Sequence, residues 1–381
     1  SSAPFPDMSH RFFLFAAALC ASAPLASSVF AAPAESIRTT RSFDADWLFS
    51  RSDAAASEDP MFDDVNWRTV RVPHDWAIEG GVAQDAPSGR GGVYRAPGVS
   101  WYRKRFSLPA TDVGRRIFVE FDGVMGNSEV WINGQKIGGR PSGYIGFACE
   151  LTGRVKLGDE ETNVLAVRTD TSRQPASRWY AGQGIYRHVR LVVTDPVRIA
   201  PHGITVTTLE IKSDHAVIHV RTSVTNYSPE PQQVTVRVDL TDPAGSPAGS
   251  IELPAHEVGI GETSDFAGDV DVAHPQFWDI AQGKLYRAAV SVAAKGKMLD
   301  DDTAVFGLRD AHFEAATGFW LNGRNVPLKG VALHQDGGAV GDAVPLALWE
   351  RRLAVLRTRG VNAIRTAHNP PAPEFLDLCD G

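Results

Sequence analysis

Between residues 36 and 308 the sequence consists of short apolar runs separated by turns rich in glycine and proline. In AVIHVRTSVTN (216–226) and QQVTVRVDLTDPAG (232–245), apolar and polar residues alternate, which is typical of strands with one buried face. No amphipathic helix pattern interrupts residues 36–194. Because strands of this kind bury their apolar faces by pairing into sheets, the region predicts β-sandwiches rather than helical or α/β layers.

The two predicted sandwiches differ in pattern and meet at Asp195-Pro196. Residues 36–195 predict a jelly-roll type, and their hairpin signal is Asn133-Gly134, a pair that favours positive φ at both turn centres. Residues 196–308, about 110 residues of short alternating strands, match an immunoglobulin-like sandwich. They have no Cys-Trp-Cys core, which excludes the antibody subclass.

The pattern changes again in residues 309–381, beginning with a second Asn-Gly hairpin in FWLNGRNVPL. LKGVALH predicts a strand that ends at His334, PLALWERRLAVLRTRG (345–360) predicts a helix, and Val361–Arg365 predicts another strand. Strand, helix, strand is a βαβ unit with a parallel pair. Since one unit cannot cover both faces of its own sheet, we expect this domain to be incomplete.

The first 31 residues read as a targeting segment. Met8 is followed by basic residues, the apolar stretch FFLFAAALCASAPLASSVF, and small residues before a break. This is the pattern of a Sec-type signal peptide, cleaved after Ala31 or, as an alternative, after Ala34. A buried core helix is the competing interpretation. The signal peptide predicts a periplasmic or secreted protein without a membrane segment after cleavage.

Charge and cysteine content exclude several classes. The formal net charge is -7 with no basic block, so nucleic acid is not expected as a partner. Beyond Cys20 only Cys149 and Cys379 remain, and their spacing gives neither a disulfide framework nor a metal motif. We expect two buried free thiols and identify no cofactor.

Polar side chains gather where the two predicted parallel strands end. His334 ends the first strand, and Arg365, His368 and Asn369 follow the end of the second. Functional groups of parallel α/β sheets collect at the carboxyl ends of strands, so these four should face one mouth. They could hydrogen-bond hydroxyls and hold a carboxylate. The alternative is a solvated rim where loops begin.

Other conspicuous polar residues favour structural roles. We expect His74 and Asp75 to pack in a turn, and Glu350 and Glu374 to be solvated. Asp300–Asp302 read as a charged loop without EF-hand spacing. The indoles of Trp101, Trp131 and Trp179 more often belong to a core than to a sugar platform. Only Trp179 has a loop context that suggests otherwise.

KGVALHQDGGAVGDAVP and GVNAIRTAHNPPAPEFLDLCD resemble the opening of the catalytic barrel of glycoside hydrolase family 2, which includes β-galactosidases, β-glucuronidases and β-mannosidases. Upstream, VPHDWAIEG, GVSWYRKRFSLP, FDGVMGNSEVWINGQKIGGRPSGYIGF and SRWYAGQGIYRHVRL resemble its sugar-binding domain. The resemblance implies a mainly β, multidomain chain: a jelly-roll β-sandwich, an immunoglobulin-like β-sandwich, then the truncated start of a (β/α)8 TIM barrel.

The resemblance also assigns roles to residues. His334 and His368 match histidines that line the sugar subsite, and Arg365 matches the arginine beside the nucleophile. Asn369 lies where many relatives carry tyrosine. The loop with Trp179 resembles a segment that reaches the barrel mouth, although Ser177 stands where some relatives carry an acidic sugar ligand.

Family 2 enzymes retain configuration, so two carboxyl groups about 5 to 5.5 Å apart are expected. The resemblance places both glutamates on later barrel strands, beyond Gly381, so we expect no catalytic carboxyl in this chain. Glu374 is not assigned that role. Some relatives use Mg²⁺ or Na⁺, but no residue here is identifiable as a ligand, so a divalent cation stays open for the full-length protein.

The loop HQDGGAVGDAVP (334–345) resembles the galactosidase form of the family. We therefore expect an exported β-galactosidase whose partners are β-galactosides, with this chain inactive alone. A β-glucuronidase or β-mannosidase is one alternative, and a non-catalytic carbohydrate-binding module is another. Assembly into a homo-oligomer is left open.

Overall fold

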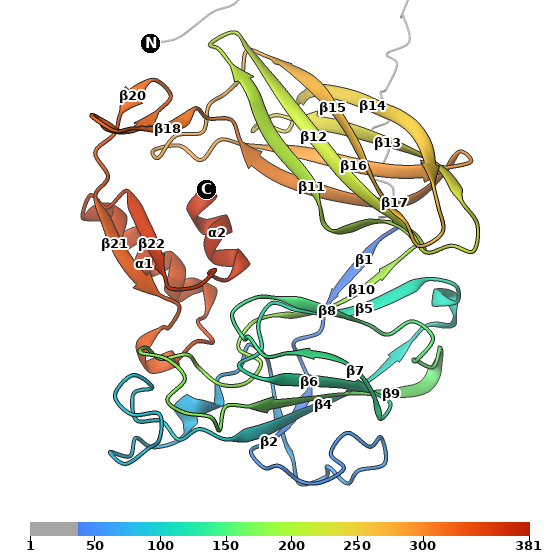
Figure 1. Cartoon of the computed structure of the whole chain (residues 1–381), viewed down its shortest axis with the longest axis vertical. Coiled ribbons are helices and arrows are strands. Elements are labelled where there is room, and N and C mark those ends of the chain that lie inside the picture. The colour runs from blue at the N-terminus through green and yellow to red at the C-terminus, as the bar shows by residue number, and fades with distance from the viewer. Residues whose placement is uncertain (1–36) are drawn as a thin grey trace, which may run out of the picture. The chain divides into compact units, whose positions relative to one another are not determined.

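The computed structural model describes residues 37–381, which form one compact unit. The predicted signal peptide lies outside the described residues. Figure 1 shows long strands through most of the chain, with two short helices near its carboxyl end. No helix among residues 37–381 reaches the length and apolar character that a membrane crossing demands.

The first group of strands makes a sandwich of two antiparallel sheets. One sheet has the order β1-β10-β5-β8 and the other β3-β2-β4-β9-β6-β7. The strands are β1 (Thr39–Ser42), β2 (Trp47–Ser50), β3 (Arg68–Val70), β4 (Val99–Leu108), β5 (Arg116–Phe121), β6 (Ser128–Ile132), β7 (Gln135–Arg140), β8 (Phe147–Glu150), β9 (Gly158–Asp170) and β10 (Val189–Thr194). The short 3-10 helices η1 (Trp76–Glu79) and η2 (Ala110–Asp112) lie in its loops.

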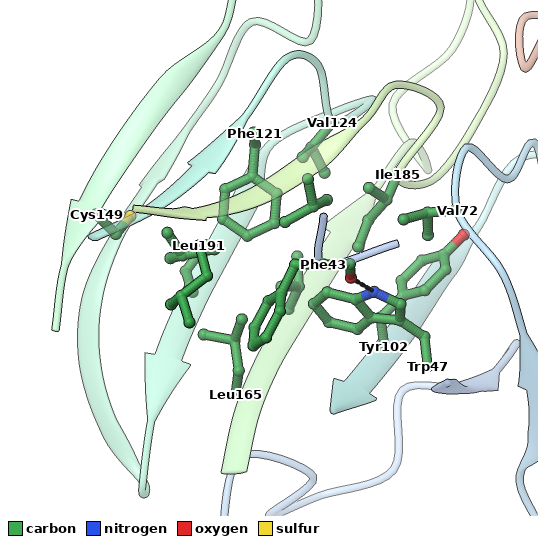
Figure 2. Close-up of a cluster of buried hydrophobic side chains, with 14 of the residues drawn as sticks. Phe43, Trp47, Val72, Tyr102, Phe121, Val124, Cys149, Leu165, Ile185 and Leu191 are labelled. Carbon is green, nitrogen blue, oxygen red and sulfur yellow. Dashed lines mark hydrogen bonds between the residues drawn. The ribbon is translucent and has the colours of Figure 1, made fainter. Parts of the chain in front are cut away.

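The core of this sandwich draws on both sheets. Figure 2 shows Trp47, Tyr102 and Leu165 from the six-stranded sheet beside Phe121 and Leu191 from the four-stranded sheet. The indole N–H of Trp47 does not stay unpaired, because it donates to a backbone carbonyl at 2.8 Å. Each large apolar side chain buried here contributes about 1.5 to 3 kcal/mol, so the two sheets hold one another firmly.

Both predicted Asn-Gly hairpins are confirmed. Asn133 (φ 50°) and Gly134 (φ 81°) connect β6 to β7, and Asn322 (φ 50°) and Gly323 (φ 73°) connect β19 (Gly318–Leu321) to β20 (Arg324–Asn325). Positive φ at both central positions matches the twist of the flanking strands.

A second sandwich follows, with sheet orders β11-β12-β15 and β14-β13-β16-β17. Its strands are β11 (Val197–Ile211), β12 (His215–Asn226), β13 (Gln232–Thr241), β14 (Pro247–Val258), β15 (Thr263–Ala273), β16 (Leu285–Ala294) and β17 (Lys297–Gly307). Burial alternates along β12: Ala216, Ile218 and Val220 are buried, and Val217 and His219 between them are more accessible. The alternation of apolar and polar residues therefore predicted the buried face of this strand correctly.

The interpretation of Asp300–Asp302 as a charged loop is wrong. The three residues lie within β17, and Asp300 is fully buried. Its carboxylate contacts the Arg38 guanidinium at 2.6 Å and accepts the backbone N–H of Ile199 at 2.7 Å. Asp302 is largely exposed. The burial of Asp300 depends on an arginine 262 positions away in sequence, which no local pattern could reveal.

We predict that Asp300→Ala lowers the free energy of unfolding by about 3 to 5 kcal/mol, because it breaks a largely buried ion pair and removes the acceptor of the Ile199 N–H. Asp302→Ala is the matched control: its exposed carboxylate lies 3.7 Å from the same guanidinium, so its loss should change the free energy by less than about 0.5 kcal/mol. Urea unfolding followed by fluorescence measures both. Equal effects of the two substitutions would contradict the burial of this ion pair.

The last group contains β18 (Ala311–Glu314), which pairs with the β19–β20 hairpin, and then the predicted βαβ unit. Strand β21 (Gly330–His334) pairs in parallel with β22 (Ala363–Ala367), and α1 (Leu346–Thr358) connects them. Helix α2 (Pro373–Asp380) follows β22 and lies beside α1 and the two strands in Figure 1.

The second strand begins two residues later than predicted. The N–H of Val361 bonds to the carbonyl of Leu356 and so still belongs to the end of α1. Asn362 exchanges hydrogen bonds with Lys329 before β21 begins. Pairing of the strands therefore starts only at Gly330 and Ala363.

The cysteine prediction is right for Cys149 and wrong for Cys379. Cys149 is buried on β8, and burial raises the pKa of its thiol to about 11. Cys379 is exposed. Helix α2 packs against its neighbours through Phe375, one turn before Cys379. The last turn of the helix, with Cys379, lines an open surface pocket together with Trp278 and Leu353, so the thiol is not covered.

Candidate functional site

Two histidines meet at the carboxyl ends of the parallel strands. The register pairs His334 with Ala367, so His368 follows directly beside it. The ring centroids of His334 and His368 are 5.1 Å apart, and the rings are perpendicular at 88°. The geometry therefore presents two imidazoles, each with nitrogen atoms able to donate or accept, at one edge of the sheet.

Trp179 from the first sandwich completes an aromatic cluster with them. Its ring centroid lies 4.7 Å from that of His368 and 6.3 Å from that of His334. Its side chain is only half-buried. An indole from a loop of one domain therefore lies against two imidazoles from the strands of another.

The other two predicted site residues both adjoin His368. The guanidinium of Arg365 is 3.3 Å from Nδ1 of His368, and Arg365 is exposed. Asn369 is half-buried, and its Nδ2 is buried without a protein partner. The structure thus brings all five predicted residues into one region.

A small cavity of about 30 Å³ lies next to the cluster, between the first sandwich and the βαβ unit. Three buried polar atoms on its lining residues have no protein partner: Oε1 of Gln335, Oδ1 of Asp342 and Nδ2 of Asn369. Buried polar atoms are rarely left unpaired, and this volume is about that of one water molecule. The site therefore offers the Gln335 amide oxygen as an acceptor, the Asn369 amide nitrogen as a donor, and the Asp342 carboxyl to water or to polar groups of a ligand.

Arg187 of the first sandwich fixes the loop that follows the second histidine. Its side chain is buried and donates to the carbonyl of Pro370 at 2.8 Å. Arg187 lies in the motif SRWYAGQGIYRHVRL, but sequence reasoning did not single it out because its partner lies 183 residues away.

Asp75 is more than the packing residue that the sequence predicted. Its buried carboxylate accepts four hydrogen bonds: Oδ1 from the N–H groups of Ala77 (3.1 Å) and Gln183 (3.0 Å), and Oδ2 from the hydroxyl of Tyr180 (2.6 Å) and the N–H of Asp342 (2.9 Å). Burial raises the pKa of Asp75, while the four bonds oppose that shift. Four donors and no acceptor suit an ionised carboxylate.

Asp342 is a second buried carboxyl close to Asp75. Burial raises its pKa well above the usual range, the negative charge of Asp75 adds to the shift, and a hydrogen bond from the Gln335 amide opposes it. Since Oδ1 of Asp342 has no partner, the protonated form is the better suited of the two to this environment.

We predict that Asp342→Asn gains stability relative to the unchanged chain as the pH rises. Below about pH 4 Asp342 is protonated whether folded or unfolded, and its favourable contribution is fully present. Above that pH the carboxyl ionises in the unfolded chain but stays protonated in the folded one. The contribution of Asp342 to stability therefore falls as the pH rises from about 4 toward the raised pKa of the folded state. Asparagine does not ionise. Thermal melting between pH 4 and 8 measures the difference, and a constant difference would contradict the shift.

The residues that the sequence analysis assigned to structural roles are only partly where it predicted. Glu350 is exposed as expected, but Glu374 is half-buried at the cavity, so the prediction of a solvated side chain is wrong for it. Trp101 is buried and its ring centroid lies 5.1 Å from that of Trp131, in keeping with a packing role. Within residues 37–381, no group of three or more His, Cys, Asp or Glu side chains is arranged to hold a metal ion.

Comparison with known families assigns nearly all of the described chain. Residues 40–196 match the family profile "Glycosyl hydrolases family 2, sugar binding domain", residues 197–309 match "Glycosyl hydrolases family 2", and residues 315–381 match "Glycosyl hydrolases family 2, TIM barrel domain". The order of the three profiles is that of the two sandwiches and the βαβ unit, and it confirms the predicted fold class.

Individual relatives and solved structures support the same family. A β-galactosidase of Bacteroides ovatus is 43% identical over 90% of this chain and 40% of its own length. A β-glucuronidase of Bacteroides fragilis is 31% identical over 82% of this chain and 45% of its own length. The crystal structure of a family 2 member from Bacteroides cellulosilyticus, 32% identical, superposes with a TM-score of 0.85 over 90% of this chain and 44% of that one.

Two β-sandwiches followed by a parallel βαβ unit, with imidazoles at the strand ends, follow the domain order of the three matched profiles. The chain belongs to glycosyl hydrolase family 2. It spans less than half the length of these curated relatives.

Proposed function

We propose that the complete protein is a retaining β-glycoside hydrolase that removes terminal non-reducing β-D-galactose residues. The observation that carries the proposal is the cluster of Trp179, His334 and His368 at the ends of two adjacent parallel strands. The 43% identity to a β-galactosidase over nearly all of the described residues supports galactose as the sugar.

In this proposal the clustered side chains bind the sugar and orient it. The imidazoles of His334 and His368 have nitrogens that can bond to hydroxyl groups, and the unpaired atoms of Gln335 and Asn369 add an acceptor and a donor nearby. The indole of Trp179 limits the space above the imidazoles. Such fixed contacts contribute to catalysis by holding the anomeric carbon where it reacts.

The chemistry itself requires two glutamates, which we place beyond Gly381. One carboxylate attacks the anomeric carbon while the other, as a carboxylic acid, gives its proton to the departing glycosidic oxygen. Water then cleaves the glycosyl-enzyme bond, and the second group takes back a proton. Arg365 lies beside His368, where its positive charge can favour the ionised form of a neighbouring nucleophile.

A β-glucuronidase is the second candidate, because a relative of 31% identity bears that name. A glucuronide carries a carboxylate that needs a cationic or hydrogen-bonding partner in the pocket, whereas a galactoside presents a hydroxyl there. A β-mannosidase, and a binding module without catalysis, complete the alternatives.

Assay of the intact gene product on aryl β-D-galactoside, β-D-glucuronide and β-D-mannoside tests the proposal. We expect kcat/KM for the galactoside to exceed the other two by about 100-fold or more, since a site built for one hydroxyl pattern rejects others strongly. His334→Ala, at the strand end, is the variant that should lose this activity. A preference for the glucuronide, or no hydrolysis at all, would rule out the assignment.

We predict that the purified 381-residue chain does not hydrolyse any of these glycosides, because the two carboxyl groups of the mechanism are placed outside it. The matched control is the intact gene product at equal concentration. Turnover by the shorter chain above the background of buffer would show that a carboxyl pair lies within it.

We also propose export from the cytoplasm, supported by the signal-peptide pattern of residues 8–31. Sequencing the amino terminus of the secreted or periplasmic protein is the check: we expect Ala32 as the new terminus, or Glu35 if cleavage follows Ala34.

A further inference from the structure

The buried carboxylate of Asp75 bonds to two different parts of the molecule. Oδ1 bonds to the N–H groups of Ala77 and Gln183, both in the first sandwich. Oδ2 bonds to Tyr180, which follows Trp179 directly, and to the N–H of Asp342 in the loop after β21. One buried oxygen therefore ties the loop of Trp179 to the loop that leaves His334.

Glycines let the two loops approach this closely. Gly341 (φ 66°) lies against Asp75, and a Cβ at that position would come within 2.3 Å of Oδ2. Gly182 (φ 67°) lies against Asp342, and a Cβ there would come within 2.7 Å of the Asp342 Cβ. Gly182 lies where the Trp179 loop meets Asp342, and Gly341 lies where the loop after β21 meets Asp75. Neither contact leaves room for a side chain on the glycine backbone.

Hydrogen bonds, ring contacts and neighbouring positions in the chain link Asp75 to the aromatic cluster from two directions. Tyr180 leads back along the chain to Trp179, which packs on His334 and His368. From Asp342 the second connection runs through the Gln335 amide, which bonds to the Asp342 carboxyl and is next to His334 in sequence. The Asp75 carboxylate is therefore connected by hydrogen bonds to the chain neighbour of Trp179 and, through Asp342, to the chain neighbour of His334.

We propose that Asp75 is a positioning residue of the sugar site, whose Oδ2 holds the Trp179 loop of the first sandwich against the strand ends that carry His334 and His368. The inference rests on the proposed function in taking this cluster as the place where sugar binds. Asp75 does not touch the cluster itself and acts through Tyr180 and Asp342.

The substitution Asp75→Asn tests whether Asp75 positions the two loops or only stabilises its own turn. The amide keeps the size of the carboxyl and one acceptor oxygen, which can serve Ala77 and Gln183. Its NH2 group then faces the N–H of Asp342, and two donors cannot bond to each other. Turning the amide over moves the same conflict onto Ala77 and Gln183.

Asp64→Asn is the matched control. Asp64 is also a buried carboxyl of the first sandwich, and its Oδ2 accepts from Arg103 at 2.8 Å and from Arg105 at 2.7 Å. Within residues 37–381, its carboxylate bonds to these two arginines of β4 and not to the loops of the cluster. It therefore reports what loss of a buried carboxylate does to the sandwich in general.

The first measurement is hydrogen exchange of the 381-residue chain in the segments 177–183 and 336–345. We expect exchange in both segments to speed up at least about tenfold in Asp75→Asn and to stay within about twofold in Asp64→Asn. Tyr180→Phe removes only the hydroxyl at 2.6 Å and should give a smaller change in the same two segments, which keeps the test decisive if Asp75→Asn fails to fold.

The second measurement is the steady-state kinetics of the intact gene product on the aryl galactoside. We expect Asp75→Asn to raise KM about tenfold or more, with a smaller fall in kcat, and Asp64→Asn to leave both near their original values. If no glycoside is hydrolysed, the proposed function fails, and hydrogen exchange alone decides the positioning role. Equal responses of Asp75→Asn and Asp64→Asn in exchange would overturn the proposal.

Discussion

The parallel pairing of β21 with β22 is the constraint on which the candidate site depends. Parallel strands share the direction in which they end, so His334 and His368 emerge at the same edge. The crossover through α1 is what permits this pairing, since two strands joined by a tight hairpin would run in opposite directions. An antiparallel arrangement would separate the two imidazoles by the length of the strands.

A βαβ unit alone does not make the pocket, because the first sandwich supplies part of it. Trp179 closes one side of the cluster, Arg187 holds the loop at Pro370, and Asp75 links the loops on either side. These residues lie on loops of a sandwich whose buried core, shown in Figure 2, draws side chains from both sheets. The candidate site is therefore shared between the first sandwich and the βαβ unit.

Local patterns were sufficient to predict much of the fold. Alternation in β12, positive φ at Asn133-Gly134, and a helix between two apolar strands each depend on neighbouring residues, and each was predictable. The site residues at the strand ends followed from the same rule. Burial of Asp300 against Arg38, and the bond from Asp342 to Asp75, depend on partners more than 250 positions apart. No periodicity in the sequence carries that information.

A crystal structure of the intact gene product with galactose bound tests the account most directly. The account predicts the sugar ring at the ends of β21 and β22, with its hydroxyl oxygens within hydrogen-bond distance of His334 and His368 and its ring next to Trp179. Galactose bound elsewhere, with these three side chains left in contact only with one another and with solvent, would contradict it.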